Sequence, residues 1–133
     1  MKYIYTLLLL LLPLGLFAQE APQTPEERQK QFAEAIEKEV DKYATALDLE
    51  DWQVFYVDSI LTHDYTAMQA ELDELGKARV SNPDIYYIAQ DKWMETIYNA
   101  FHKVFNEEQW SKYLKSGAGK DKKARDKRAA KRN

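Results

Sequence analysis

One run of apolar residues, between positions 54 and 75, constrains the fold of this chain more than any other feature of its sequence. Its members recur at steps of three or four residues: Val54, Val57, Leu61, Tyr65, Met68, Leu72 and Leu75. Steps of this size return to one face of an α-helix, which has 3.6 residues per turn. The pattern therefore predicts one long helix over residues 50–75. Gly76 follows at once, and we expect it to adopt the left-handed conformation that ends many helices.

Two further segments carry the same period. Residues 25–46 follow Thr24-Pro25-Glu26-Glu27, which fits a capping box with proline at the first helical position. Residues 83–104 follow Asn82-Pro83, a favoured cap and a residue that can begin a helix. A short fourth helix is expected after Asn106. The sequence thus predicts an all-α fold of three to four helices, arranged either as an elongated helical hairpin or as a thin bundle.

The first eighteen residues have the pattern of a signal peptide. Lys2 is followed by an almost wholly apolar run from Ile4 to Leu16, and Ala18 is a small residue at a suitable cleavage position. We expect cleavage near Ala18 and a periplasmic or secreted protein, with a retained membrane anchor as the alternative. The expected organisation is a signal peptide over residues 1–18, a helical domain over 19–116 and a basic tail over 117–133.

Charge is distributed unevenly, and the chain contains no cysteine. Residues 19–111 carry 8 basic against 20 acidic residues, whereas residues 112–133 carry 10 basic against 2 acidic residues. The tail offers only alanine for burial, so we expect it to be disordered or loosely helical. The basic residues of the tail would screen the acidic body, contact an anionic membrane surface or attract acidic clients. The residues assigned to an anionic-surface contact are Lys120, Lys122, Lys123, Arg125, Lys127, Arg128, Lys131 and Arg132. The expected export and the lack of aromatic residues between the charges of the tail argue against nucleic acid as a partner.

A short signature occurs twice, at positions where helices are expected to begin. Each copy has an apolar residue, a residue at the cap position and a glutamine three residues after the cap. The glutamine can bond back to the backbone amide of the cap, while the apolar residue packs on the first turn. The two copies predict matching helix corners. Their residues are Leu49, Glu50 and Gln53 in the first copy, and Phe105, Asn106 and Gln109 in the second.

This pair of motifs resembles the two L-T-x-x-Q motifs of the periplasmic Spy/CpxP family, with Glu50 and Asn106 at the positions of the threonines. The resemblance covers roughly residues 28–115. It implies a thin, curved, helical homodimer that acts as an ATP-independent chaperone or senses envelope stress, with metal binding in some branches. It therefore implies partners among unfolded or envelope proteins. The motif residues are architectural in that family, so the resemblance implies no active site.

The aromatic residues exceed what a thin helical scaffold can bury. Several lie off the main apolar stripes and predict an apolar surface that either forms the dimer interface or binds clients. We assign this surface to Trp52, Phe55, Tyr56, Tyr87 and Tyr98.

We expect no enzyme activity, no cofactor and no metal site. The serines stand in no nucleophile motif, and the chain has no glycine-rich phosphate loop. His63 and His102 lack the spacing of paired metal ligands, and a structural role is the simpler interpretation. The alternatives to a chaperone-like adaptor are an envelope structural module that docks through the basic tail, and a metal-responsive sensor that uses one of these histidines.

Overall fold

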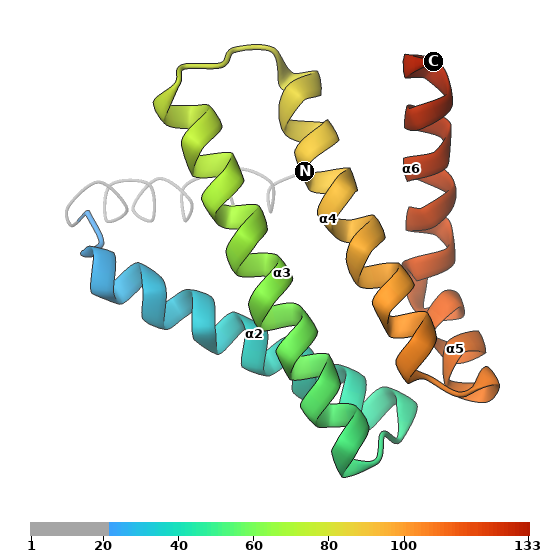
Figure 1. Ribbon diagram of the computed structural model, residues 1–133. Coiled ribbons are helices and arrows are strands. Elements are labelled where there is room, and N and C mark those ends of the chain that lie inside the picture. The colour runs from blue at the N-terminus through green and yellow to red at the C-terminus, as the bar shows by residue number, and fades with distance from the viewer. Residues whose placement is uncertain (1–21) are drawn as a thin grey trace, which may run out of the picture. The chain divides into compact units, whose positions relative to one another are not determined.

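The computed structural model describes residues 22–133, and all its regular elements are helical (Figure 1). The elements are α2 (Pro25–Leu47), α3 (Asp51–Lys77), α4 (Pro83–Val104), α5 (Glu107–Tyr113), the π-helical turn η1 (Leu114–Ala118) and α6 (Gly119–Arg132). No strand occurs within residues 22–133, so the predicted all-α fold is confirmed. The proposed signal peptide and its cleavage position near Ala18 lie outside the described residues. The described residues fall into two units, which divide between Phe32 and Ala33.

In the first unit, the start of α2 has the predicted capping box. The Glu27 amide donates to Thr24 Oγ1 at 3.1 Å, and the Thr24 amide donates to a carboxylate oxygen of Glu27 at 3.0 Å. Both bonds satisfy amides that the helix itself cannot pair.

In the second unit, α3 and α4 run side by side in opposite directions, and α6 runs along α4 (Figure 1). The apolar face predicted for each helix supplies the core. Phe101, Leu61, Ile97 and Val57 have the least exposed side chains, at 0–2%. Burying one such side chain stabilises the fold by about 1.5–3 kcal/mol. The remaining buried apolar residues are Ile36, Val40, Leu47, Ala89, Phe105 and Tyr113.

The end of α3 differs from the prediction. Gly76 stays within the helix, and Arg79 is the residue in the left-handed region, with φ of 57°. The Val80 amide donates to Leu75 O at 3.1 Å and the Arg79 amide donates to Gly76 O at 3.0 Å. This is the bond pair of a Schellman motif, in which the left-handed residue lies one position beyond the cap. At the end of α2, Asp48 likewise has a left-handed φ of 50°, and the Leu49 amide donates to Ala44 O at 3.1 Å.

The basic segment also differs from the prediction. It is helical, which was one of the two expected states, but it forms the continuous helix α6 and belongs to the compact unit of residues 33–133. The expected boundary at residue 117 is only a kink. Gly117 lies in η1 with φ of 121°, a conformation that other residues rarely adopt. The kink turns the chain so that α6 returns along α4 (Figure 1).

Candidate functional site

The two glutamines of the repeated motif cap their helices as predicted. Gln53 Oε1 accepts a bond from the Glu50 amide at 2.9 Å, and Gln109 Oε1 accepts a bond from the Asn106 amide at 3.0 Å. Both side chains are buried, with exposed fractions of 3% and 7%. Each glutamine therefore satisfies the backbone of its own corner inside the protein.

The same two carboxamides bond to each other. Gln53 Nε2 donates to Gln109 Oε1 at 2.7 Å, and Gln109 Nε2 donates to Gln53 Oε1 at 3.0 Å. The remaining N–H groups reach backbone carbonyls of the opposite corner: Gln53 Nε2 also donates to Val104 O at 3.0 Å, and Gln109 Nε2 to Asp48 O at 3.5 Å. We call this arrangement the glutamine clasp. It joins the α2–α3 corner to the α4–α5 corner.

Both corners form a capping box, but their cap residues differ. At the second corner, Asn106 Oδ1 accepts a bond from the Gln109 amide at 2.8 Å. At the first corner, the Glu50 carboxylate also accepts a bond from the Trp52 indole N–H at 2.6 Å. Of the two apolar motif residues, Phe105 is buried and Leu49 is half-buried. The first corner therefore also holds the exposed Trp52 in place.

Trp52 begins a cluster of exposed aromatic side chains at the start of α3. Trp52, Phe55 and Tyr56 are 51%, 66% and 51% exposed. The rings of Trp52 and Tyr56 meet edge to face at 6.1 Å, and those of Phe55 and Tyr56 at 5.7 Å. We call these three residues the aromatic patch. It is an exposed apolar surface of the kind that marks interaction sites.

An open groove adjoins the aromatic patch between α3 and α4. Its volume is about 670 Å³. Trp52 and Tyr56 form its α3 side, and the α4 side is lined by Thr96, Asn99, Ala100, Lys103 and Val104. The groove thus combines aromatic faces with a few polar groups and one cation, which suits an extended or helical apolar segment.

A second exposed apolar group lies at the start of α4. Ile85, Tyr87 and Ile88 are 39%, 51% and 44% exposed. Because α3 and α4 are antiparallel, this group and the aromatic patch lie at opposite ends of the helix pair (Figure 1). Tyr87 is thus exposed as predicted, although it is not part of the aromatic patch.

Tyr98 does not lie on the predicted apolar surface. Its side chain is half-buried against Trp110, with ring centroids 4.9 Å apart. Lys122 Nζ and the guanidinium carbon of Arg125 lie 5.5 Å and 5.4 Å from the Tyr98 ring centroid. The Trp110 ring of α5 and the cationic side chains of α6 therefore cover this residue, contrary to the prediction.

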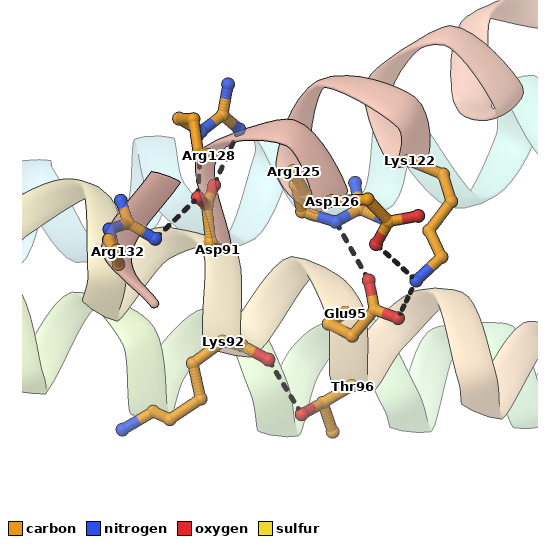
Figure 2. Close-up of polar contacts among 9 residues, drawn as sticks. All are labelled: Asp91, Lys92, Glu95, Thr96, Lys122, Arg125, Asp126, Arg128 and Arg132. Carbon is orange, nitrogen blue, oxygen red and sulfur yellow. Dashed lines mark hydrogen bonds and ion pairs between the residues drawn. The ribbon is translucent and has the colours of Figure 1, made fainter. Parts of the chain in front are cut away.

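Asp91 on α4 holds the end of α6 through two arginines (Figure 2). Arg128 forms a bidentate pair with it, with Nε–Oδ2 of 2.8 Å and Nη2–Oδ1 of 2.7 Å. Arg132 Nη1 lies 3.6 Å from Asp91 Oδ2. The Arg128 hydrogen bonds hold the pKa of the Asp91 carboxyl below its usual range.

Glu95, one helical turn further along α4, holds the start of α6 (Figure 2). Its carboxylate accepts a bond from Arg125 Nε at 3.1 Å and another from Lys122 Nζ. Arg125 is 7% exposed, and its Nη2 has no hydrogen-bond partner in the described residues. Four of the eight basic residues predicted to contact an anionic surface are therefore paired with the protein's own carboxylates.

The histidines do not gather metal ligands. His63 Nδ1 lies 2.7 Å from Asp64 Oδ1, and the His102 ring stacks on Trp110 with a centroid distance of 4.1 Å. Within residues 22–133, no three histidine, cysteine, aspartate or glutamate side chains converge on one point where a metal ion could bind.

Tyr43 is half-buried and Tyr113 is buried, and both belong to the aromatic part of the core. Burial raises the pKa of the Tyr43 and Tyr113 hydroxyls above its usual value. Both phenols therefore stay protonated near neutral pH. Their rings meet edge to face at 5.7 Å, as expected for core residues.

Comparison with known proteins adds no relatives. No protein-family model matches the chain, and neither a curated protein nor a solved structure does. None of the helices between residues 22 and 133 combines the length and apolar composition needed to cross a bilayer.

Proposed function

We propose that this chain is an exported, non-enzymatic chaperone-like or envelope-stress adaptor protein, which binds apolar segments of unfolded or envelope proteins. The observation that carries the proposal is the aromatic patch beside an open groove. Trp52, Phe55 and Tyr56 are each at least half exposed, and burying such side chains against a client is favourable.

Two features support this proposal. The glutamine clasp fixes the corner from which α3 starts, and Glu50 restrains the Trp52 indole, so the patch is held ready before a client arrives. The paired motif also resembles that of the Spy/CpxP family, whose members are periplasmic chaperones and stress sensors. Nothing in this mode of binding requires a reaction or a cofactor.

The proposal can be tested by the aggregation of an unfolded client without ATP. The purified protein should slow the rise in light scattering. Replacing the patch with serine (Trp52→Ser, Phe55→Ser and Tyr56→Ser) should raise the half-effective concentration at least about tenfold. The matched control replaces the exposed group at the far end of the helix pair (Ile85→Ser, Tyr87→Ser and Ile88→Ser). An equal loss in both variants, or no suppression by the unsubstituted protein, would contradict a client site at the patch.

A second copy of the chain is the other candidate partner for the patch. The two exposed apolar groups lie at opposite ends of the antiparallel α3–α4 pair. In a dimer with two-fold symmetry, the aromatic patch of one copy would therefore meet the group of Ile85, Tyr87 and Ile88 on the other copy. Sedimentation of the unsubstituted protein should then give the mass of a homodimer. Both serine variants should sediment as monomers, whereas a pure client site would leave the mass unchanged.

The metal-responsive alternative is tested separately. Titration calorimetry with zinc and with copper near neutral pH should show heat that is lost in the His63→Ala or His102→Ala variant if either histidine binds metal. Absence of binding by the unsubstituted protein would remove this alternative and leave the client-binding proposal unaffected.

A further inference from the structure

The basic residues of α6 are divided between two faces of the helix. Lys122, Arg125, Arg128 and Arg132 point to α4 and pair with its carboxylates (Figure 2). The other four basic residues are all lysines and are all exposed: Lys120, Lys123, Lys127 and Lys131. Within the described residues, none of these four lysines forms an ion pair.

The four exposed lysines lie in one row. Their steps of three, four and four residues place them within an arc of about 80° on a helix of 3.6 residues per turn. The row is about 16 Å long at 1.5 Å per residue. The row points away from the face of α6 that carries Arg125, Arg128 and Arg132. We call these residues the lysine row.

The residue types fit the two roles. A guanidinium forms the bidentate bond that Arg128 makes with Asp91, and it tolerates burial because it is weakly hydrated. An ammonium is a compact, strongly hydrated charge that suits a wet surface. The helix α6 carries eight basic residues and two acidic ones, Asp121 and Asp126. The two carboxylates of α4 that pair with α6, Asp91 and Glu95, add two more negative charges. Four positive charges remain, which equals the number of lysines in the row.

The row itself indicates its partner. It contains no aromatic side chain on which a nucleic-acid base could stack. The only apolar residues of α6 are alanines, so the helix has no anchor for a protein groove. A lipid headgroup layer presents phosphates at every spacing, and attracting it needs only a straight row of cations. We propose that the lysine row is a docking surface for membranes rich in anionic phospholipid, while the arginine face fastens α6 to the protein.

This docking surface is independent of the aromatic patch. It would hold the acidic body at a membrane while α3 and its groove remain available. It also narrows the sequence-based expectation from eight basic residues to four, because the other four already have carboxylate partners.

The test is flotation of the full chain, purified after export, with vesicles of phosphatidylcholine alone or mixed with phosphatidylglycerol. Binding should require phosphatidylglycerol and should fail in 1 M salt, where the Debye length is about 3 Å instead of about 10 Å at 0.1 M. The variant Lys120→Gln, Lys123→Gln, Lys127→Gln and Lys131→Gln should bind roughly 600-fold more weakly, at about fivefold per lysine.

The matched control removes the same charge from four other lysines that are exposed and form no ion pair within the described residues: Lys30→Gln, Lys38→Gln, Lys42→Gln and Lys115→Gln. It should bind within about threefold of the unsubstituted protein. The circular dichroism spectra of all three proteins should agree. If the row variant has lost helix, the double variant Lys123→Gln and Lys127→Gln replaces it, and its vesicle binding should be about 25-fold weaker. Equal losses in the row and control variants, equal binding to both vesicle types, or tighter binding to a single-stranded oligonucleotide than to the vesicles would overturn the proposal.

Discussion

The side-chain amides of Gln53 and Gln109 bond to each other in both directions, at 2.7 Å and 3.0 Å, across 56 residues of sequence. Each of them also accepts the backbone N–H of its own helix cap. Burying an amide side chain costs free energy unless its donors and acceptors are hydrogen-bonded. Here both the oxygen and the nitrogen of each amide form hydrogen bonds. The pair therefore fixes how the two corners sit against each other.

We predict that Gln53→Leu destabilises the protein by about 2–4 kcal/mol. The substitution leaves the Glu50 amide and the Gln109 carboxamide without their partner inside the protein. Urea unfolding followed by circular dichroism measures the change. Gln90→Leu, at an exposed position of α4, is the control and should stay within about 0.5 kcal/mol of the unsubstituted protein.

The coupling between the glutamines is measured by a double-mutant cycle. Gln53→Leu combined with Gln109→Leu should cost less than the sum of the single changes by about 1 kcal/mol or more, because the second substitution removes a group that the first has already orphaned. Additive losses would mean that the two amides act separately.

Two glycines should respond in opposite directions to alanine. Gly117→Ala forces a residue with a Cβ into φ of 121° and should cost about 1–3 kcal/mol. Gly76→Ala meets no atom within 4 Å inside helix α3 and should stabilise the protein by about 0.5–1 kcal/mol. Thermal melting distinguishes them. Destabilisation by Gly76→Ala would contradict the placement of Gly76 inside α3.

Removing the Asp91 charge should loosen α6 without unfolding the rest. In Asp91→Asn the bidentate bond to Arg128 is lost, and hydrogen exchange at amides 125–132 should become roughly tenfold faster. Exchange in α3 should not change. Asp41→Asn, at an exposed position of α2, is the matched control, and an equal change there would point to net charge instead of the pair.

Acid should have the same local effect. The Arg128 bonds hold the Asp91 pKa below its ordinary value of 3.8, so the folded protein binds this proton more weakly than the unfolded chain does. The stability from the pair is therefore complete above pH 3.8 and is lost as the pH falls below it. Exchange at amides 125–132 should accelerate in that acidic range. Asp91→Asn should lack this step, and a step of equal size in the variant would contradict the assignment.

The helices themselves could be predicted because their determinants are local. The period of three and four residues marked α2, α3 and α4, and the caps at Thr24, Asn82 and Asn106 lie where their helices begin. The repeated glutamines indicated two matching corners. The sequence could not show that the corners meet, because the bonds between Gln53 and Gln109 require a particular packing of α3 against α4.

Local rules misjudged one helix end. Glycine is the usual left-handed residue, but Gly76 continues α3 and Arg79 takes that conformation. The Val80 amide bonds to Leu75 O, and the resulting Schellman motif outweighs the cost of φ of 57° at an arginine. Which residue takes the left-handed conformation therefore depends on the path of the loop between α3 and α4.

The sequence by itself determined the all-helical class, the approximate spans of α2, α3 and α4, and the paired corners, since periodicity and capping act within a few residues along the chain. Only the tertiary structure decided the fate of the basic segment. The body offers many carboxylates, and the sequence does not say which of them come within bonding distance of the arginines. The position of α6 beside α4 brings Asp91 and Glu95 within bonding distance of the arginine face, covers part of Tyr98 and leaves four lysines exposed in a row.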